Sequence, residues 1–377
     1  MKKLRELYSI DRLPIFQNRM YDTEAEAKDC PKGDVRLVED LQTGLVYNAS
    51  FRPELMVYDE HYQNEQAVSP LFQEHLESVA KIVERTIGRH DLVEVGCGKG
   101  YFLELLLQQG FDITGFDPAY EGTDTRIKRH YFEPSLGIKA SGLILRHVLE
   151  HIQEPVDFLA RLKDANGGSG LIYIEVPNFD WILSKSAWFD IFYEHVNYFR
   201  LADFDRMFDK VVESGTVFGE QYLYVVAELA SLKIPEYNEN KRVSFPEEFL
   251  HLLIEQNRTE QNRTEQNRTE QNRTEQNRTE QNRTEQNTAV IWGGASKGVI
   301  FSLLKKREGV LFNTVIDINP AKQGKFLPAT GLKVQSPTDA LSKLAPGATI
   351  WVMNSNYLDE IKKMSGNTYN YICIDHE

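Results

Sequence analysis

The residues whose types and spacing point most directly to chemistry form a glycine-rich turn between an apolar strand and a helix, within residues 91–102. The turn carries an acid and three glycines: Glu94, Gly96, Gly98 and Gly100. Glycine lacks a β-carbon, so the backbone can turn sharply there and approach a ligand. A second expected strand, 112–116, ends in Asp117, whose carboxylate is placed to accept hydrogen bonds from a ribose diol. Together the two features predict a nucleoside site.

The spacing of the turn distinguishes between kinds of nucleotide. A dinucleotide fingerprint reads G-x-G-x-x-G, with the pyrophosphate on the helix N-terminus, whereas this turn reads acid-x-G-x-G-x-G. It resembles motif I of class I S-adenosylmethionine (SAM) methyltransferases, although a tight turn of any α/β domain is the alternative. The resemblance implies that the glycines lie against the methionine half of SAM and that Asp117 binds its ribose. The cofactor-binding residues that we expect are Glu94, Gly96, Gly98, Gly100, Tyr101, Asp117, Arg146 and His147.

Two further blocks follow in the order typical of that class. The segment RHVLEH, 146–151, comes after an apolar strand at 142–145 and looks like the post-strand segment that lies beside the cofactor. His147 and His151 could instead cap or pack the next helix, which is our preferred interpretation for His151. A third strand, 170–178, ends in polar atoms at the carboxyl edge of the sheet, where open α/β sheets bind ligands. The fold class predicted is α/β with a Rossmann-like SAM methyltransferase core.

Composition limits the other possibilities. The chain has 377 residues, 41% of them hydrophobic, which is enough for two or three domains with real cores. The formal charge of -13 argues against a nucleic-acid partner, because phosphate backbones require clustered Lys and Arg. We expect no membrane partner either, because no apolar run is long enough to span a bilayer. Three distant cysteines and the absence of a leader peptide favour a reducing cytoplasm.

The chain is expected to divide into four parts. Residues 1–65 form a small β-rich N-terminal wing, and 66–235 form the methyltransferase domain, which begins with a helical stretch over 69–84. Residues 236–288 form a helical linker, and 289–377 form a second, Rossmann-like α/β domain.

The linker contains a pentapeptide, EQNRT, repeated from Glu255 through Thr284. Its residues favour helix, and each Glu has an Arg three residues on. Five residues advance a helix by about 140°, so the copies present no fixed face, which indicates a polar spacer and not a coiled coil. The Asn-Arg-Thr triplets match the N-glycosylation pattern, but that modification needs a secreted chain.

After the repeat, residues 289–304 again read as strand, small-residue turn and helix. Free amides at the helix N-terminus beside Ser296 and Lys297 would form an anion site. The alternative is that the glycines only allow close packing of the strand on the helix. Further strands at 313–317, 349–353 and 369–374 complete a small parallel sheet.

Three segments carry a narrower resemblance: GGASKG at 293–298, DINPAKQG at 317–324 and FDIFYEHVNYF at 189–199. They are similar to the sugar C-methyltransferase family, which acts on nucleotide-linked keto-deoxysugars. The resemblance implies that Glu194 and His195 lie in the active site, with His195 as the base. The candidate catalytic residues are His195, Glu194, Tyr193 and Tyr198. The candidate substrate-binding residues are Asn178, Gly294, Ser296, Lys297 and Lys322.

The chain departs from that family in two places. Members carry cysteine pairs for zinc in the wing, but residues 37–44 contain no Cys-x-x-Cys, so we expect no metal. The family's Tyr-x-Glu-His reads Phe192-Tyr193-Glu-His here, so the tyrosine is shifted by one position or replaced by phenylalanine. Aromatic residues around Tyr198 could form a core stripe, but their place after the strand that carries Asn178 favours a lid over the substrate.

The chemistry predicted is SAM-dependent methyl transfer to a small acceptor, with a nucleotide-linked sugar as the acceptor that the resemblance implies. The protein has to hold the acceptor in line with the activated methyl group and remove a proton, a task that suits His195. The alternatives are O- or N-methylation of a polysaccharide precursor or other small metabolite, and a SAM-binding scaffold without turnover. The oligomeric state does not follow from the sequence.

Overall fold

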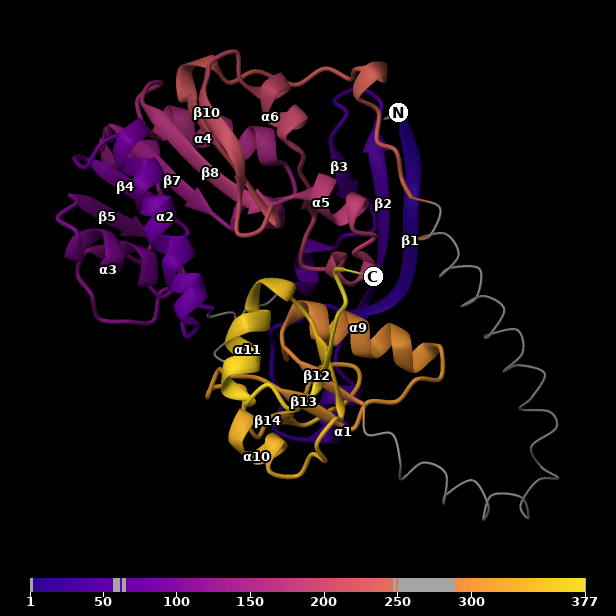
Figure 1. Cartoon of the computed structure of the whole chain (residues 1–377). Coiled ribbons are helices and arrows are strands. Elements are labelled where there is room, and N and C mark those ends of the chain that lie inside the picture. The colour runs from indigo at the N-terminus through magenta and orange to yellow at the C-terminus, as the bar shows by residue number, and fades with distance from the viewer. Residues whose placement is uncertain (1–2, 57–61, 63–65, 247–248, 250–288, 377) are drawn as a thin grey trace.

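A computed structural model describes residues 3–56, 62, 66–246, 249 and 289–376 of the chain. These residues form three β-sheets, one in each of the regions expected to be wing, methyltransferase core and C-terminal domain (Figure 1). The EQNRT repeat and the helix predicted for it lie outside the described residues.

The central sheet has seven strands in the order β10-β11-β8-β7-β4-β5-β6. Its strands are β4 (Leu92–Val95), β5 (Ile113–Phe116), β6 (Ile127–Lys128), β7 (Gly142–Arg146), β8 (Leu171–Pro177), β10 (Val211–Val217) and β11 (Tyr222–Glu228). Strands β4 to β8 run parallel, and β11 is antiparallel to both of its neighbours. The parallel strands are mostly apolar, as expected for a sheet that has buried residues on both faces, and Glu94 of β4 and Glu175 of β8 are the buried acids among them. This arrangement confirms the predicted Rossmann-like core.

Helices and 3-10 turns connect these strands. The bounds are α2 (Pro70–Thr86), α3 (Tyr101–Gln108), η2 (Pro134–Leu136), η3 (Leu149–His151), α4 (Pro155–Ala165), α5 (Phe179–Ser184), η4 (Trp188–Asp190), α6 (Leu201–Met207), η5 (Leu229–Ser231) and η6 (Glu239–Lys241). Helix α2 begins one residue after the expected start, because Ser69 is its N-cap: the Ser69 side chain accepts from the Phe72 amide, and Pro70 occupies the first turn.

The N-terminal sheet has four strands, and the chain supplies them from two distant segments. Its elements are β1 (Leu4–Pro14), α1 (Glu24–Lys28), β2 (Lys32–Asp40), β3 (Val46–Asn48), η1 (Pro53–Leu55) and β9 (Asn197–Tyr198). The strand order is β1-β2-β3-β9, all antiparallel, and Tyr198 of β9 pairs with Val46 of β3. Since β9 comes directly after the Glu194-His195 pair, the wing sheet fixes the backbone beside that pair.

The C-terminal sheet has five parallel strands in the order β14-β13-β12-β15-β16. Four of them correspond to the strands expected of a small parallel sheet, and β14 is not among those expected. Its elements are β12 (Val290–Trp292), α9 (Ser296–Arg307), β13 (Thr314–Ile316), β14 (Val334–Gln335), α10 (Pro337–Leu341), β15 (Thr349–Val352), η9 (Ser355–Tyr357), α11 (Leu358–Met364) and β16 (Asn370–Cys373). Apolar side chains are buried on both faces of this sheet.

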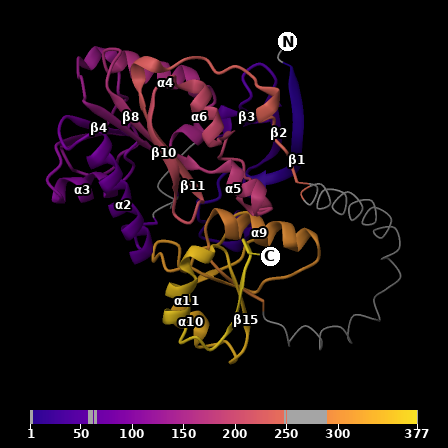
Figure 2. The same ribbon diagram turned by 45° about the horizontal axis from the view of Figure 1, so that its top comes forward.

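The C-terminal sheet and the wing share a single buried apolar cluster with the segment 179–198. Helix α9 lies at this junction in both views (Figures 1 and 2). Its Phe301 ring stacks on Trp188 of η4, with ring centroids 5.6 Å apart, and Phe326 forms a β-bridge to Tyr21 of the wing. Three distant parts of the sequence therefore meet around α9.

The expectation that the aromatic residues of this segment form a lid is wrong. Tyr193, Tyr198 and Phe199 are almost completely buried, with exposed fractions of 0%, 3% and 1%. Two of them belong to the shared apolar cluster and the third to the core of the central sheet. Their removal from water stabilises the fold, so this aromatic stripe is core.

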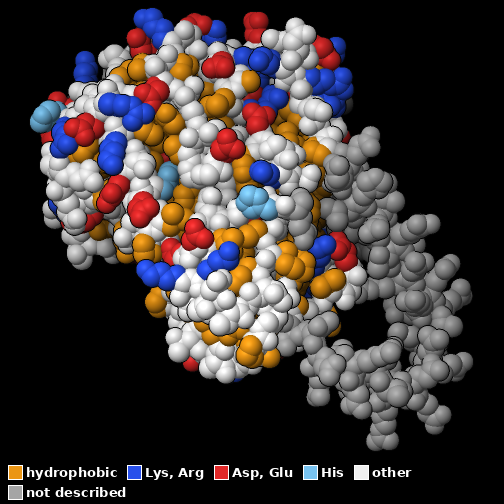
Figure 3. Space-filling view, in the orientation of Figure 1, with side chains coloured by type: hydrophobic (Ala, Val, Ile, Leu, Met, Phe, Trp, Pro, Cys, Tyr) orange, Lys and Arg blue, Asp and Glu red, His pale blue; other side chains and the backbone are white. Residues whose placement is uncertain are grey.

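Charged side chains of both signs lie on the surface of the molecule (Figure 3). On the face shown in Figure 3, Lys and Arg side chains lie interspersed with Asp and Glu and form no separate basic stripe. Among the described residues, no helix is both long and apolar enough to cross a membrane.

Candidate active site

The glycine turn joins β4 to α3 with left-handed backbone at all three predicted glycines. The φ angles of Gly96, Gly98 and Gly100 are 73°, 54° and 82°, a region that residues with a β-carbon adopt at a cost. A β-carbon on Gly96 would lie 2.5 Å from Cγ2 of Val148, whereas one on Gly98 would have no atom within 4 Å. The turn is thus packed against Val148 at Gly96 and open at Gly98, where a cofactor could approach the backbone.

Asp117 lies immediately beside this turn, as the sequence predicts. Its Oδ2 accepts a hydrogen bond from the Gly98 amide at 2.8 Å, and its Oδ1 accepts from the Ala119 amide at 2.8 Å. Each carboxylate oxygen has a second lone pair, so both can still accept from ribose hydroxyls. Tyr101, at the start of α3, is 51% exposed next to the turn. The carboxylate is therefore held rigidly at the strand end where a ribose would bind.

Glu94 is buried below the turn, and its Oε2 has no hydrogen-bond partner among the described residues. Burial raises the pKa of Glu94 to about 7, although the nearby Arg146 lowers it and Asp117 raises it further. The Arg146 guanidinium lies over the Phe102 ring of α3, 4.7 Å from its centroid. A buried polar atom without a hydrogen-bond partner is rare, so Oε2 of Glu94 is available to accept a hydrogen bond from a bound ligand.

Glu175 is the centre of a buried network that the sequence analysis does not single out. Its Oε1 lies 3.1 Å from His75 Nε2, 3.0 Å from Arg146 Nη2 and 3.0 Å from His147 Nε2, and Tyr173 donates to its Oε2 at 2.6 Å. Although burial opposes ionisation, the nearby Arg146 and hydrogen bonds from two histidines hold its pKa well below the ordinary range. An acid inside the apolar strand 171–177 is the sequence signal that would have found it.

His147 extends this network toward the pocket. It has a left-handed backbone, with φ of 52°, and its Nδ1 lies 3.4 Å from Glu150 Oε1. Burial favours the neutral ring, but the carboxylates of Glu150 and Glu175 outweigh it and raise the pKa of His147 to about 9. The Tyr222 ring packs edge-on against the imidazole, with centroids 4.6 Å apart. Arg146 and His147, at the end of β7, therefore both lie against the carboxylate of Glu175.

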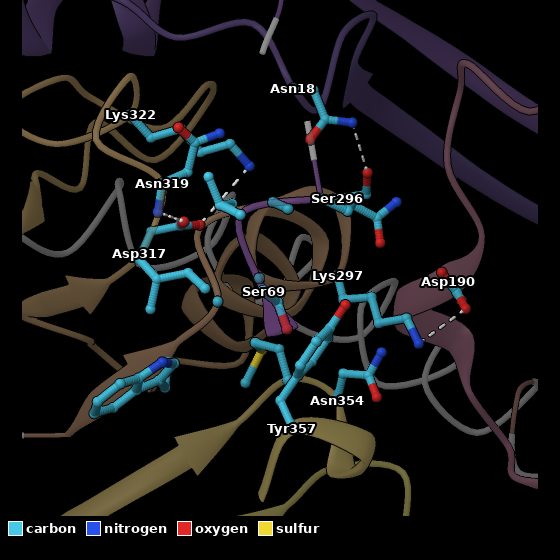
Figure 4. A pocket seen from close by; sticks show the side chains of 18 of the residues that line it. Asn18, Ser69, Asp190, Ser296, Lys297, Asp317, Asn319, Lys322, Asn354 and Tyr357 are labelled. Atoms are coloured by element: carbon cyan, nitrogen blue, oxygen red, sulfur yellow. Dashed lines mark hydrogen bonds and ion pairs between the residues drawn. The ribbon is translucent and has the colours of Figure 1, made fainter. Parts of the chain in front are cut away.

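A cavity of about 260 Å³ opens at this edge of the sheet and continues to the C-terminal domain. Its lining comes from the wing, the start of α2, the loop after β7, the segment 190–195 and the C-terminal domain. Figure 4 shows its C-terminal side, where side chains from α9, the β13 end and η9 point into one space.

At the core end of the cavity lie Glu194 and His195, the predicted catalytic pair. The His195 ring packs on Phe192, with centroids 4.0 Å apart, and lies edge-on to His151. Burial, aided by His151 and His147, lowers the pKa of His195 well below its ordinary value, so the ring is neutral at pH 7. Burial likewise raises the pKa of Glu194 to about 8.

Four of the predicted catalytic and substrate-binding residues do not line the cavity, and of the predicted cofactor-binding residues only His147 does. The Tyr193 hydroxyl accepts from the Arg52 amide and the Tyr198 hydroxyl bonds to the backbone of Phe192, so both tyrosines serve the wing core. Asn178 caps α5 and donates to a loop carbonyl, and the Gly294 amide donates to Asp317. Of the two aromatic residues that precede Glu194, Phe192 lines the cavity and Tyr193 does not.

Ser296, Lys297 and Lys322 line the C-terminal end of the cavity, as predicted (Figure 4). Lys297 Nζ lies 3.3 Å from Asp190 Oδ2, donates to Gln221 at 2.9 Å and lies 4.6 Å from the Trp181 ring centroid. These contacts hold one cation at the first turn of α9, where the backbone amides are free.

Asp317 was not among the predicted site residues. It ends β13, accepts from the Gly294 amide at 2.9 Å and lies 3.7 Å from Lys322 Nζ. Its contact with a glycine-turn amide repeats that of Asp117 with Gly98 in the core. The C-terminal domain repeats the core's pattern of strand, glycine turn and acid, and this repetition is the sequence signal that could have identified Asp317.

Comparisons with known proteins agree with this geometry. Residues 58–211 match the family model described as a methyltransferase domain, which covers less than half of the chain. No curated protein gives a significant match. Residues 58–211 are therefore a methyltransferase domain, the protein is an enzyme of the SAM-dependent methyltransferase class, and its cofactor is SAM.

Several solved structures are similar to part of this chain. One is 1,6-didemethyltoxoflavin-N1-methyltransferase from Burkholderia thailandensis, with 17% identity over 42% of this chain and 80% of that one, and a TM-score of 0.32. A second is magnesium protoporphyrin IX methyltransferase from Synechocystis PCC 6803, with 18% identity, 42% and 82% coverage, and a TM-score of 0.32. A SAM-dependent methyltransferase from Archaeoglobus fulgidus has 19% identity, 44% and 100% coverage, and a TM-score of 0.31.

Proposed function

We propose that this enzyme transfers the methyl group of SAM to a carbon atom of a nucleotide-linked keto-deoxysugar. The observation that carries the proposal is that one cavity joins His195 at the core to Lys297 at the N-terminus of α9. A sugar joined through phosphates to a nucleoside has a reacting end and an anionic end, and this cavity offers a group suited to each. The resemblance of residues 189–199 and 293–298 to sugar C-methyltransferases supports the same substrate class.

The C-terminal end of the cavity suits the nucleotide. Backbone amides at the first turn of α9 and the ammonium group of Lys297 favour phosphate oxygens. Asp317, held by the Gly294 amide, has lone pairs left for hydroxyl donors such as those of a ribose. Lys322, 4% exposed, adds a second cation near the same carboxylate.

The core end suits the proton transfer. SAM supplies an activated methyl group, so the protein has to align the acceptor carbon and accept the proton which that carbon loses. We assign the second task to His195, whose neutral imidazole offers a lone pair at pH 7. Phe192 packs on the ring and fixes its orientation toward the cavity. The electron pair of the carbon–hydrogen bond would form the new carbon–carbon bond to the methyl group, while the sulfur–methyl bond of SAM would break and leave its electron pair on sulfur.

The test is to incubate the full chain with SAM and nucleoside diphosphate-linked keto-deoxysugars. We expect a product one methyl group heavier by mass spectrometry, with the new methyl on carbon by NMR. Replacing His195 with Asn should lower kcat by about a hundred-fold and leave the SAM dissociation constant unchanged. Replacing Lys297 with Ala should chiefly raise KM for the sugar nucleotide, whereas Lys81→Ala on the exposed side of α2 should change neither.

Methylation on oxygen or nitrogen would assign the enzyme to the alternative reaction class. If SAM binds but no sugar nucleotide accepts a methyl group, the proposed substrate is wrong. An unchanged pH profile and kcat in His195→Asn would remove His195 from the chemistry while leaving the substrate assignment intact.

A further inference from the structure

Three potential metal ligands meet at the core end of the cavity. Glu150 and His151 belong to η3, and His195 precedes β9 on a segment that the wing sheet fixes. One ligand atom from each lies within 4.8 Å of the others, and all three side chains line the cavity. The cluster is therefore open to an ion that enters with, or before, the acceptor.

The hydrogen bonding of His151 prepares it for this role. Its Nδ1 donates to the Glu194 carbonyl oxygen at 2.9 Å, so the proton is on Nδ1 and the Nε2 lone pair is free. That Nε2 lies 4.0 Å from Glu150 Oε1. Histidines that bind metals commonly donate their other ring nitrogen to a backbone carbonyl in this way, because the bond fixes tautomer and orientation.

Glu150 gives an independent indication. Its side chain is 2% exposed, and its Oε2 has no hydrogen-bond partner among the described residues. Its other oxygen lies 3.4 Å from His147 Nδ1. Burying a carboxylate oxygen without a partner costs free energy, and a cation bound beside the two imidazoles would remove that cost.

We propose that Glu150, His151 and His195 bind one divalent transition-metal ion at the core end of the cavity. Two imidazoles and one carboxylate suit zinc, cobalt, nickel or iron, whereas calcium and magnesium prefer sets of oxygen ligands. Ligands about 2.1 Å from a tetrahedral ion lie roughly 3.4 Å apart, so binding would draw the three side chains together by about 1 Å. Three protein ligands leave a coordination position open toward the cavity.

The open position faces the space in which we place the acceptor, where a metal ion would polarise a carbonyl or hydroxyl oxygen. One imidazole lone pair cannot hold a metal ion and a proton together. His195 therefore accepts a proton only in the metal-free form. In the metal-loaded form the ion would polarise the acceptor oxygen, and the proton lost by the acceptor would have to pass to solvent water. Metal binding itself does not rest on the proposed substrate.

The test is calorimetric titration of the metal-free, untagged full chain with Zn²⁺, together with Co²⁺ titration followed by visible absorption. We expect one ion per chain and a Co²⁺ spectrum typical of imidazole ligation. His151→Ala, His195→Ala and Glu150→Gln should each weaken binding at least ten-fold. His90→Ala, which removes an exposed histidine outside the cluster, should bind as wild type does.

The melting temperature of each variant in the absence of metal shows whether it is folded. The conservative Glu150→Gln keeps the side-chain volume if the alanine variants unfold. No stoichiometric binding by the wild type, or equal affinities in wild type and all three folded variants, would overturn the proposal. Because the titration contains no SAM and no sugar nucleotide, this failure is separate from failure of the proposed function.

Discussion

Two glycines of the SAM turn should lose different amounts of stability on the same substitution. Alanine at either position has to adopt a left-handed backbone, which costs roughly 1–2 kcal/mol. At Gly96 the new methyl would also lie 2.5 Å from the Val148 side chain, and overpacking of that kind costs typically about 1–3 kcal/mol more. At Gly98 there is no such neighbour, so we expect Gly96→Ala to lose about 2–5 kcal/mol of unfolding free energy and Gly98→Ala about 1–2 kcal/mol.

Cofactor binding should show the reverse order. The open space at Gly98 is where the turn can approach SAM, so a methyl group there should weaken SAM binding by about ten-fold or more even though the protein stays folded. Gly137, which also has positive φ and no atom near its missing β-carbon, lies outside the turn. Gly137→Ala is thus the matched control: it should cost the same backbone strain as Gly98→Ala and leave SAM affinity alone.

The assays are urea unfolding for the free energies and calorimetry for SAM affinity at a temperature where all three variants are folded. Equal stability losses at Gly96 and Gly98 would show that Val148 moves aside without cost. Unchanged SAM affinity in Gly98→Ala would show that the cofactor does not approach this face of the turn, and the site would have to be placed elsewhere.

The other predictions concern two carboxylates. Asp117→Ala should weaken SAM binding by about ten-fold or more, because a charge-assisted hydrogen bond to ribose contributes roughly 1.5–3 kcal/mol; calorimetry showing wild-type affinity would contradict this. Glu175→Gln should lower the unfolding free energy by about 3 kcal/mol at pH 7, because it leaves the buried charge of Arg146 uncompensated. The depressed pKa of Glu175 stabilises the fold above its unfolded value of about 4.3, and this contribution is lost as pH falls below it. Acid titration of unfolding should therefore be shallower below pH 4.3 in Glu175→Gln than in wild type, and identical slopes would refute the network's electrostatic role.

Local patterns in the sequence predicted the elements that bind the cofactor. Strand β4, its glycine turn and the acid after β5 are contiguous motifs, and parallel strands bring their carboxyl ends to one edge by topology alone. The turn geometry at Gly98 and its hydrogen bond to Asp117 follow from residues 19 positions apart on neighbouring strands. The C-terminal sheet was predicted for the same reason, since each strand, turn and helix in it is local.

What could not be predicted depends on contacts between distant segments. Whether Tyr198 faces a ligand or a core depends on its pairing with Val46, about 150 residues earlier, and nothing near either residue encodes that pairing. Tyr193 likewise appeared catalytic from its place next to Glu194, but its hydroxyl is used by the backbone of Arg52. An acid within an apolar strand marks Glu175 itself, but its network could not be predicted because the four partners come from α2, β7, the turn after β7 and its own strand.

Because β9 belongs to the wing sheet, the wing of this enzyme is not a separable unit that ends at residue 65. A boundary drawn at residue 65 cuts the wing from its fourth strand, because Asn197–Tyr198 comes from the middle of the methyltransferase sequence. A chimera that exchanges the wing with that of a related enzyme has to exchange residues 179–199 as well, or the new sheet meets a mismatched edge two residues from His195. Recombination at conventional domain borders would separate these pieces, so the wing and residues 179–199 have to be engineered as one unit.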